Sequence, residues 1–194
     1  KINEILSSVP NLALEDVPIG KDEKSNKVIK KIGELKKFNF KVKPHTILGT
    51  TKKNMDFDLA SKLSGARFVV LKDNLALLER ALINFMIDTH TEKFNYTEIS
   101  PPIIVNESAM YGTGQLPKFE MDQYEIKTDK EDLRKFLIPT AEVSLTNLVR
   151  ETILDIKDLP LRYVASTPCF RKEAGSYGKD TKGMMRQHQF YKVE

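Results

Sequence analysis

The residues best suited to chemistry lie near the end of the sequence. Two β-strands are predicted there, at about 163–173 and 185–194, with a loop rich in glycine and lysine between them. Because strand side chains alternate between two faces, one surface of this hairpin should carry a guanidinium, two carboxylates and an aromatic ring. These side chains belong to Arg171, Glu173, Phe190 and Glu194.

This combination of charges and an aromatic ring has two interpretations. Buried charges are costly unless they are paired or used, so such a face is a poor hydrophobic core and a good binding surface. The same residues also fit an ordinary charged hairpin whose strands exchange ion pairs. The residue pattern alone leaves both interpretations open.

A second candidate set precedes a predicted helix. Apolar residues at 145, 148, 149 and 153 mark that helix, and Thr140 and Glu142 come just before it. Threonine is a good helix N-cap, and a carboxylate in the first turn is favoured by the helix dipole. Taken by themselves, Thr140 and Glu142 therefore fit a capping role better than a binding role.

Composition limits the other kinds of site. The 194 residues are 40% hydrophobic and 30% charged, which is typical of a globular chain. One cysteine and three histidines leave too few ligands for a zinc cage, so no metal site made of protein side chains is expected. Cys169 should pack as a small hydrophobe, and His188 should support the structure through hydrogen bonds.

The sequence also bears on location. It contains no apolar run of the roughly 20 residues that cross a bilayer and no signal-peptide core at its start. A cytoplasmic protein with no membrane partner is therefore expected. The basic, glycine-rich end suggests a surface that meets phosphates, although the charge alone fits an ordinary solvated surface better.

The start of the chain predicts little stable structure. A short helix is expected over residues 1–9, followed by an extended polar connector over 10–25. Between 27 and 42, a basic amphipathic helix and short strands both fit the pattern. Strands are favoured because Gly33 and the β-branched and aromatic residues disfavour a helix.

The middle of the chain alternates helices and strands. Residues 56–63 predict a helix capped by an aspartate, and residues 67–72 predict a buried strand. The longest helix should begin at residue 73 or 74 and run to about 93, apolar around most of its circumference. A strand over 96–99 ends at Pro101-Pro102. Together these elements predict an α+β fold with a mostly antiparallel sheet flanked by helices.

Between residues 169 and 194 the sequence opens with F-R-x-E and ends with H-Q-F-x-K-V-E. This run resembles motif 2 of the class II aminoacyl-tRNA synthetases and, in detail, the seryl-tRNA synthetase family. The resemblance covers nearly the whole chain from about residue 10, and further segments agree in the family's order. These segments are 62–68, 78–84, 96–98 with Pro101-Pro102, 110–117 and 139–142.

The resemblance implies that ATP is a substrate, with Mg²⁺ bridging its phosphate oxygens. Arg171 would contact the α-phosphate of ATP and the carboxylate of serine, and catalysis would depend on it. Glu173 would contact the adenine end of ATP, and Phe190 would stack on adenine. Gln187 would touch ATP mainly through its backbone, and Lys172 would add positive charge near the phosphates.

The resemblance also implies where L-serine binds. Thr140, Ala141 and Glu142 match the family's serine-binding T-x-E segment. Arg171 would hold the serine carboxylate, and Glu194 matches a second acidic serine contact. The two glutamates would together hold the ammonium and hydroxyl groups, without zinc.

The implied activity is that of a ligase. It activates L-serine to seryl-adenylate with ATP and transfers serine to tRNA(Ser), and the family also charges tRNA(Sec). Residues 1–25 would be the end of a helical tRNA-binding arm with its connector, and 26–194 the N-terminal part of the catalytic domain. The helix and strand between Leu78 and Pro102 match motif 1 and predict a homodimer. No third signature motif occurs before Glu194, so the chain is expected to be an inactive piece of the enzyme.

Two other functions fit parts of the sequence. A non-catalytic relative would bind a nucleotide or RNA, and a basic hairpin domain would bind RNA without ATP. An RNA-binding module has no reason to keep six complementary side chains together, which favours the synthetase interpretation. These are Thr140, Glu142, Arg171, Glu173, Phe190 and Glu194.

Overall fold

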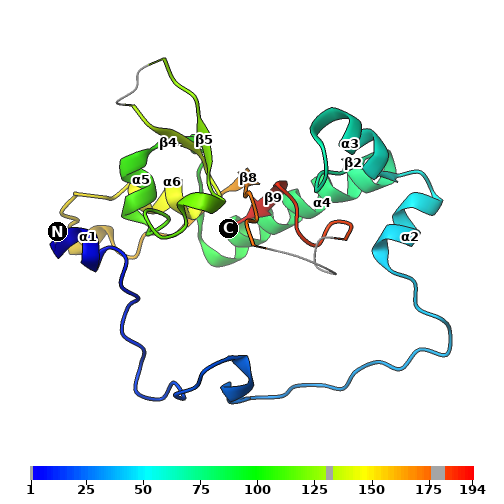
Figure 1. Cartoon of the computed structure of the whole chain (residues 1–194), viewed down its shortest axis with the longest axis horizontal. Helices are drawn as coiled ribbons and strands as arrows, with labels where there is room; N and C mark the ends of the chain where they lie inside the picture. Colours follow the sequence, from blue (N-terminus) through cyan, green and yellow to red (C-terminus); the bar gives the residue numbers. More distant parts are fainter. Residues whose placement is uncertain (1, 130–132, 176–181) are drawn as a thin grey trace. The chain divides into compact units, whose positions relative to one another are not determined.

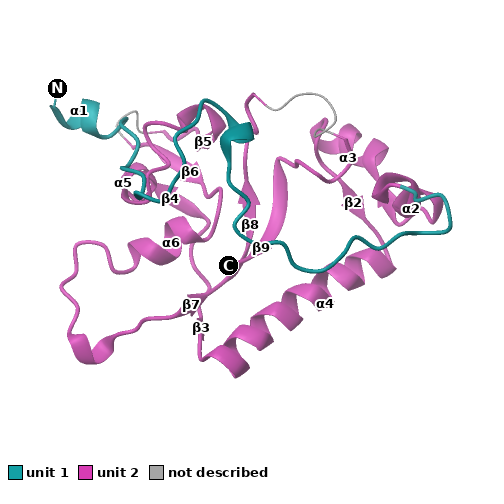
Figure 2. Cartoon of the chain, turned by 90° about the horizontal axis from the view of Figure 1, so that it is seen from below, with its two compact units in different colours: residues 1–43 teal, residues 44–194 magenta. Residues whose placement is uncertain are grey.

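The computed structural model describes residues 2–129, 133–175 and 182–194 (Figure 1). Contacts divide the chain into two compact units, residues 1–43 and 44–194, which Figure 2 shows in different colours. All the strands among the described residues belong to the second unit.

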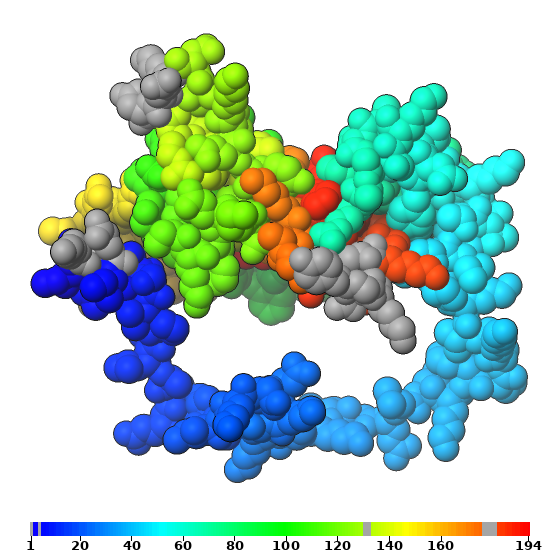
Figure 3. All heavy atoms as spheres, viewed as in Figure 1, coloured from blue at the N-terminus to red at the C-terminus, as the bar shows by residue number. Residues whose placement is uncertain are grey.

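The first unit has little regular structure. It contains helix α1 (Ile2–Leu6) and the 3-10 turn η1 (Glu23–Ser25). Residues 27–42 form neither strand nor helix, so the expected strands and the alternative helix are both wrong. The large apolar side chains of this stretch are at least half exposed, up to 95% for Leu35. Figure 3 shows the stretch as a single thin segment of the chain. A strand needs a partner strand or an apolar layer, and the described part of this unit offers neither.

The second unit begins with short elements around a capped helix. The Asp56 carboxylate accepts a hydrogen bond from the Leu59 N–H at 2.9 Å, and Gly65 ends the helix with a φ of 91°. The predicted capped helix is therefore confirmed, whereas the strand expected over 67–72 shrinks to two half-buried residues. The elements are α2 (His45–Thr51), β1 (Met55–Asp56), α3 (Phe57–Ser64) and β2 (Val70–Leu71).

The longest helix, α4, spans Asn74–Asp88 and passes directly into a π-helical turn, η2 (Thr89–Lys93). Its predicted extent is confirmed. The helix contacts β9 (Gln189–Val193), beside which it runs in Figure 2, yet much of its apolar surface stays exposed. Side chains between 48% and 64% exposed are Leu77, Leu78, Leu82 and Phe85.

The main core lies around a three-stranded antiparallel sheet in the order β4 (Ile104–Asn106), β6 (Lys135–Leu137), β5 (Tyr124–Ile126). Helix α5 (Glu107–Gly112) and helix α6 (Glu142–Asn147) pack against each other. The buried cluster is Val105, Met110, Leu116, Phe136, Ile138 and Val143. The turns η3 (Glu120–Asp122) and η4 (Ile156–Asp158) complete this half of the unit.

Two further strand pairs carry the end of the chain. Strand β3 (Thr97–Glu98) runs parallel to β7 (Tyr163–Val164), and β8 (Ser166–Phe170) runs antiparallel to β9. The predicted α+β class with mostly antiparallel pairing is confirmed. Among the described residues, no helix is both long and apolar enough to reach across a membrane.

Helix α6 differs from its prediction. It was expected around residues 145–153, but it covers Glu142–Asn147, and Ile153 is fully exposed. Val143 and Leu145 face two different buried clusters. The apolar residues beyond the helix have no such layer beneath them, so their spacing alone does not extend it.

Arg134 ties three elements of the second unit together. Its guanidinium binds the carboxylates of Glu107 (2.7 Å), Glu120 (2.5 Å) and Glu125 (2.8 and 2.9 Å). Its charged group also lies 5.0 Å from the centre of the Phe136 ring. The hydrogen bonds to Glu125, Glu120 and Glu107 raise the pKa of the arginine above its already high usual value. One cation therefore joins α5, η3 and β5 over the core.

Replacing Arg134 with alanine should leave three carboxylates close together without a cation. We expect Arg134→Ala to lower the free energy of unfolding by about 1–2 kcal/mol, since the network is partly exposed. The measurement is urea denaturation at low and high salt, and salt should reduce the loss. Arg162→Ala, which removes an exposed arginine without a side-chain partner among the described residues, is the control. An Arg134→Ala protein as stable as wild type at low salt would contradict the stabilising role of Arg134.

Candidate active site

The floor of the site is the pair of strands β8 and β9. Cys169 lies opposite Phe190, and the ladder is continued by the N–H of Arg171, which donates to the His188 carbonyl at 3.0 Å. At the other end, Ala165 and Glu194 exchange two backbone hydrogen bonds. Opposite residues of an antiparallel pair share a face. The register therefore places Arg171, Phe190 and Glu194 on one face of the hairpin, as the alternation predicts.

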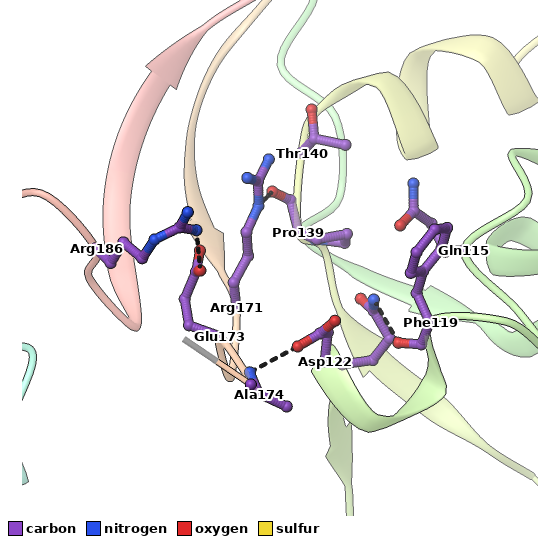
Figure 4. Close-up of a pocket in the computed structure, with 11 residues that line it drawn as sticks. Gln115, Phe119, Asp122, Pro139, Thr140, Arg171, Glu173, Ala174 and Arg186 are labelled. Carbon is purple, nitrogen blue, oxygen red and sulfur yellow. Dashed lines mark hydrogen bonds and ion pairs between the residues drawn. The ribbon is translucent and has the colours of Figure 1, made fainter. Parts of the chain in front are cut away.

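A pocket of about 490 Å³ opens beside this face. Residues from 115–123, 139–140 and 171–175 line it, together with Arg186 (Figure 4). The three segments are far apart in the sequence, and all of them belong to the second unit. Thr140, Arg171 and Glu173, which were singled out from the sequence, thus line one cavity.

The Arg171 guanidinium is held by two contacts, while its terminal nitrogens remain available to a ligand. Its Nε donates to the Pro139 carbonyl at 3.1 Å, and its guanidinium carbon lies 5.2 Å from the centre of the Phe190 ring. Within the described residues, its two terminal nitrogens have no hydrogen-bond acceptor. A planar fork fixed in this way is suited to a carboxylate or a phosphate.

Thr140, Lys192 and Glu194 form a hydrogen-bonded cluster. The Thr140 hydroxyl donates to Glu194 Oε2, and Lys192 Nζ lies 2.9 Å from the hydroxyl and 2.7 Å from Glu194 Oε1. The backbone N–H of Glu142 also points to Glu194 Oε2 at 3.3 Å. The N-cap of α6 is Ala141, so the alternative in which Thr140 caps the helix is wrong. Thr140 instead links the start of α6 to the end of β9.

The charge of Glu194 is set by opposing effects. Burial by itself raises the pKa of this carboxyl, but the hydrogen bonds from Lys192 and Thr140, with the charge of Lys192, outweigh it and lower the pKa below 4.5. Glu194 is therefore ionised at neutral pH. A carboxylate has about four lone-pair sites, so it retains acceptor capacity for a further donor.

Glu173 lies just beyond β8, where the strand has ended. Its φ is +50°, its carboxylate pairs with Arg186 at 2.8 Å, and its carbonyl accepts from Arg67 at 3.0 Å. The strand predicted to reach 173 stops at Phe170, and the left-handed backbone of Glu173 prevents it from resuming there. The alternative of cross-strand ion pairs thus holds for Glu173 and Arg186.

The other candidate residues are not among those that line this pocket. Lys172 Nζ lies 5.9 Å from the Tyr124 ring centre, and the Glu142 side chain is exposed. Ala141 is fully buried in a small apolar cluster with Leu145 and Ala165. Gln187 and Phe190 line a second pocket of about 390 Å³ together with residues of α3, β2 and α4.

His188 and Cys169, which were expected to have structural roles, lie in structural positions. His188 Nδ1 lies 3.0 Å from the Arg171 carbonyl, and its ring lies near the rings of Phe68 and Tyr124. Cys169 is completely buried, and burial raises the pKa of its thiol. Gly178, Lys179 and Asp180 of the predicted loop lie outside the described residues.

Sequence reasoning missed several pocket residues. Alternation puts Arg186 and Lys192 on the right face but gives them no partner. Asp122 and Gln123 carried no signal, because their partners are far away in the sequence. Gln123 is 3% exposed, and its amide donates to the Phe119 carbonyl at 3.0 Å. Within the described chain no group of three or more histidine, cysteine, aspartate or glutamate side chains could hold a metal ion.

The sequence and fold match known proteins. A family model described as the tRNA synthetase class II core domain (G, H, P, S and T) matches residues 121–194. The serine–tRNA ligases of Pelagibacter ubique and Brucella canis are 63% and 56% identical over all 194 residues. The chain spans 46% and 44% of their lengths, less than half in each case.

Two solved structures agree. The seryl-tRNA synthetase of Pyrococcus horikoshii complexed with ATP has a TM-score of 0.86 at 39% identity, over 99% of this chain and 46% of that one. The cytoplasmic serine-tRNA ligase of Naegleria fowleri in complex with AMP has a TM-score of 0.87 at 28% identity, over 98% and 44%. The resemblance to seryl-tRNA synthetases is confirmed. This likeness to seryl-tRNA synthetases extends over all the segments that line the pocket.

The lowered pKa of Glu194 predicts how stability depends on pH. A carboxyl whose folded pKa is lowered contributes stability above its unfolded pKa and loses it as pH falls through the folded pKa. The difference in unfolding free energy between wild type and Glu194→Gln should be constant from about pH 6 to 8 and shrink below pH 4.5. Urea denaturation across pH measures it. A difference that stays constant down to about pH 3 would contradict the cluster.

Proposed function

We propose that the complete gene product containing this chain is a serine–tRNA ligase. It joins L-serine to ATP, forming seryl-adenylate and pyrophosphate, and then transfers serine to tRNA(Ser) or, as in the family, to tRNA(Sec). The observation that carries the proposal is the Arg171 guanidinium, whose terminal nitrogens are available beside the Thr140–Lys192–Glu194 cluster. The whole length of this chain matches part of the serine–tRNA ligases.

Activation requires a carboxylate oxygen of serine to attack the α-phosphorus of ATP while the bond to pyrophosphate breaks. The carboxylate is already ionised at neutral pH, so the protein needs no general base. The terminal nitrogens of Arg171 would contact both reacting anions and stabilise the charge that gathers between them. The hydrogen bond from Arg171 to Pro139 and the contact of its guanidinium with the Phe190 ring keep this group in place before substrates arrive.

ATP would lie across the hairpin. Glu173 would contact the adenine end, Phe190 would stack on adenine, and Gln187 would contribute its backbone. Lys172 would add charge near the phosphates. Mg²⁺, which the resemblance implies, would be held chiefly by phosphate oxygens and would offset their charge, since no cluster of ligating side chains occurs in the described residues.

Serine would lie beside the cluster at the end of β9. Glu142 and Glu194 would hold its ammonium and hydroxyl groups, because desolvated donors need acceptors. Thr140 and Ala141 would border the site, and Arg171 would hold the carboxylate. Recognition of serine would need no zinc.

The exposed apolar side chains of helix α4 support a proposal about oligomeric state. The half-exposed apolar side chains of α4, with the strand up to Pro102, would form a homodimer interface. Residues 1–25 would end a helical tRNA-binding arm, and residues 26–194 would form the N-terminal part of the catalytic domain. The protein would work in the cytoplasm without a membrane partner.

Serine-dependent exchange of pyrophosphate into ATP tests this proposal. The complete gene product should catalyse it, and Arg171→Ala should lower the rate by about 10²–10³, since a donor to developing charge is lost. Serine binding should weaken much less. Arg162→Ala, which removes an arginine outside the pocket, should leave the exchange unchanged.

An Arg171→Ala protein with wild-type exchange would exclude this arginine from the mechanism. A wild-type protein that binds ATP or RNA but shows no serine-dependent exchange would favour a non-catalytic binding function instead.

A further inference from the structure

The backbone beyond β8 changes partners at the edge of the pocket. The Arg171 N–H still donates to β9, at the His188 carbonyl, 3.0 Å away. The next donor, the Lys172 N–H, turns to the carbonyl of Asp122 at 2.9 Å. The Ala174 N–H then donates to the Asp122 carboxylate at 2.7 Å. One residue of η3 thus takes over from β9 immediately after Arg171 (Figure 4).

Glu173 lies between these two hydrogen bonds. Its φ of +50° is unfavourable for a residue with a side chain, and such a backbone persists only when its surroundings hold it. Asp122 accepts hydrogen bonds from the backbone N–H groups of the residues before and after Glu173, Lys172 and Ala174. Loss of the carboxylate removes one of the contacts that hold this backbone, and those from Arg67 and Arg186 act on the carbonyl and the side chain of Glu173.

The segment that carries Asp122 is itself held firmly. Glu120 in the same turn binds Arg134, and Gln123, the following residue, is buried against Phe119. Figure 3 shows the orange residues after β8 directly against the green residues of this segment. Asp122 therefore links the segment just beyond β8 to a turn that is itself held in place.

We propose that Asp122 is a positioning residue for ATP in the proposed serine activation. Its carboxylate acts through the backbone N–H of Ala174. It holds the 172–174 backbone so that Glu173 faces the adenine end of ATP. The inference rests on the proposed function and adds a residue to it.

The serine end of the site is independent of this clamp. Thr140, Lys192 and Glu194 hold one another without any contact to Asp122. Loss of the clamp should therefore weaken ATP use more than serine use. A general loss of folding would instead affect both substrates together.

Three variants of the complete gene product separate the possibilities in the exchange assay. Asp122→Ala should raise KM for ATP about tenfold and KM for serine less than about threefold, because one charge-assisted hydrogen bond is lost. Asp122→Asn keeps an acceptor oxygen in place and should stay within about threefold of wild type. Asp122→Glu keeps the charge but displaces the oxygen, so it should resemble Asp122→Ala.

Asp158→Ala is the matched control. Asp158 also ends a three-residue 3-10 turn, η4, but it is exposed and its carboxylate has no partner within the described residues. This variant should behave as wild type in both KM values and in melting temperature.

Several results would overturn the assignment. These are an unchanged KM for ATP in Asp122→Ala, an equal rise in both KM values, or an Asp122→Asn protein as impaired as the alanine variant. If Asp122→Ala is insoluble, the contrast between Asp122→Asn and Asp122→Glu decides the question alone. Wild-type protein without exchange activity would refute the proposed function, whereas wild-type activity with insensitive Asp122 variants refutes only this inference.

Discussion

The register between β8 and β9 is the constraint on which the site depends. It sets Cys169 opposite Phe190 and continues to the Arg171–His188 and Ala165–Glu194 pairs. A slip of one residue would turn one strand's side chains to the other face. Arg171 would then lose its contact with Phe190, and Glu194 would move away from Thr140. Cys169 and Thr167 lie on the same face as these residues, and both are buried, which opposes such a slip.

Around this hairpin, charges are stabilised by partners from distant segments. Lys192 and Glu194 are partly buried and neutralise each other, and Thr140 joins them from the start of α6. At the other end, Asp122 and Arg186 hold the segment that contains Glu173. Desolvated charges without such partners would be costly. The pocket is therefore shaped in advance, and the terminal nitrogens of Arg171 in it have no acceptor among the described residues.

Local signals predicted the elements whose stability is local. The aspartate cap and glycine stop predicted the bounds of α3, and the apolar periodicity predicted those of α4 together with η2, within a residue or two. Alternation placed Arg171, Phe190 and Glu194 on one face. The family resemblance supplied the fold and the candidate roles, which no spacing could have given.

Long-range contacts account for what the sequence did not reveal. The stretch 27–42 has strand-forming residues but no apolar layer, and β8 ends early because Asp122 withdraws its backbone from β9. Thr140 has the residue type of a helix cap, yet its hydroxyl is used by Glu194 and Lys192. For β8 and Thr140 a partner distant in sequence outweighs the local preference, whereas the described part of the first unit offers 27–42 no partner.

We propose that the end of β9 recognises serine through Glu194. The most direct test is pyrophosphate exchange with serine and with alanine, for wild-type protein and Glu194→Ala. Wild type should prefer serine by roughly 10⁴, because a site built for a hydroxyl leaves its acceptor unpaired when alanine enters. Glu194→Ala should lose most of its serine activity and most of that preference while its KM for ATP stays nearly unchanged. A variant that keeps both its serine activity and its discrimination against alanine would contradict the account.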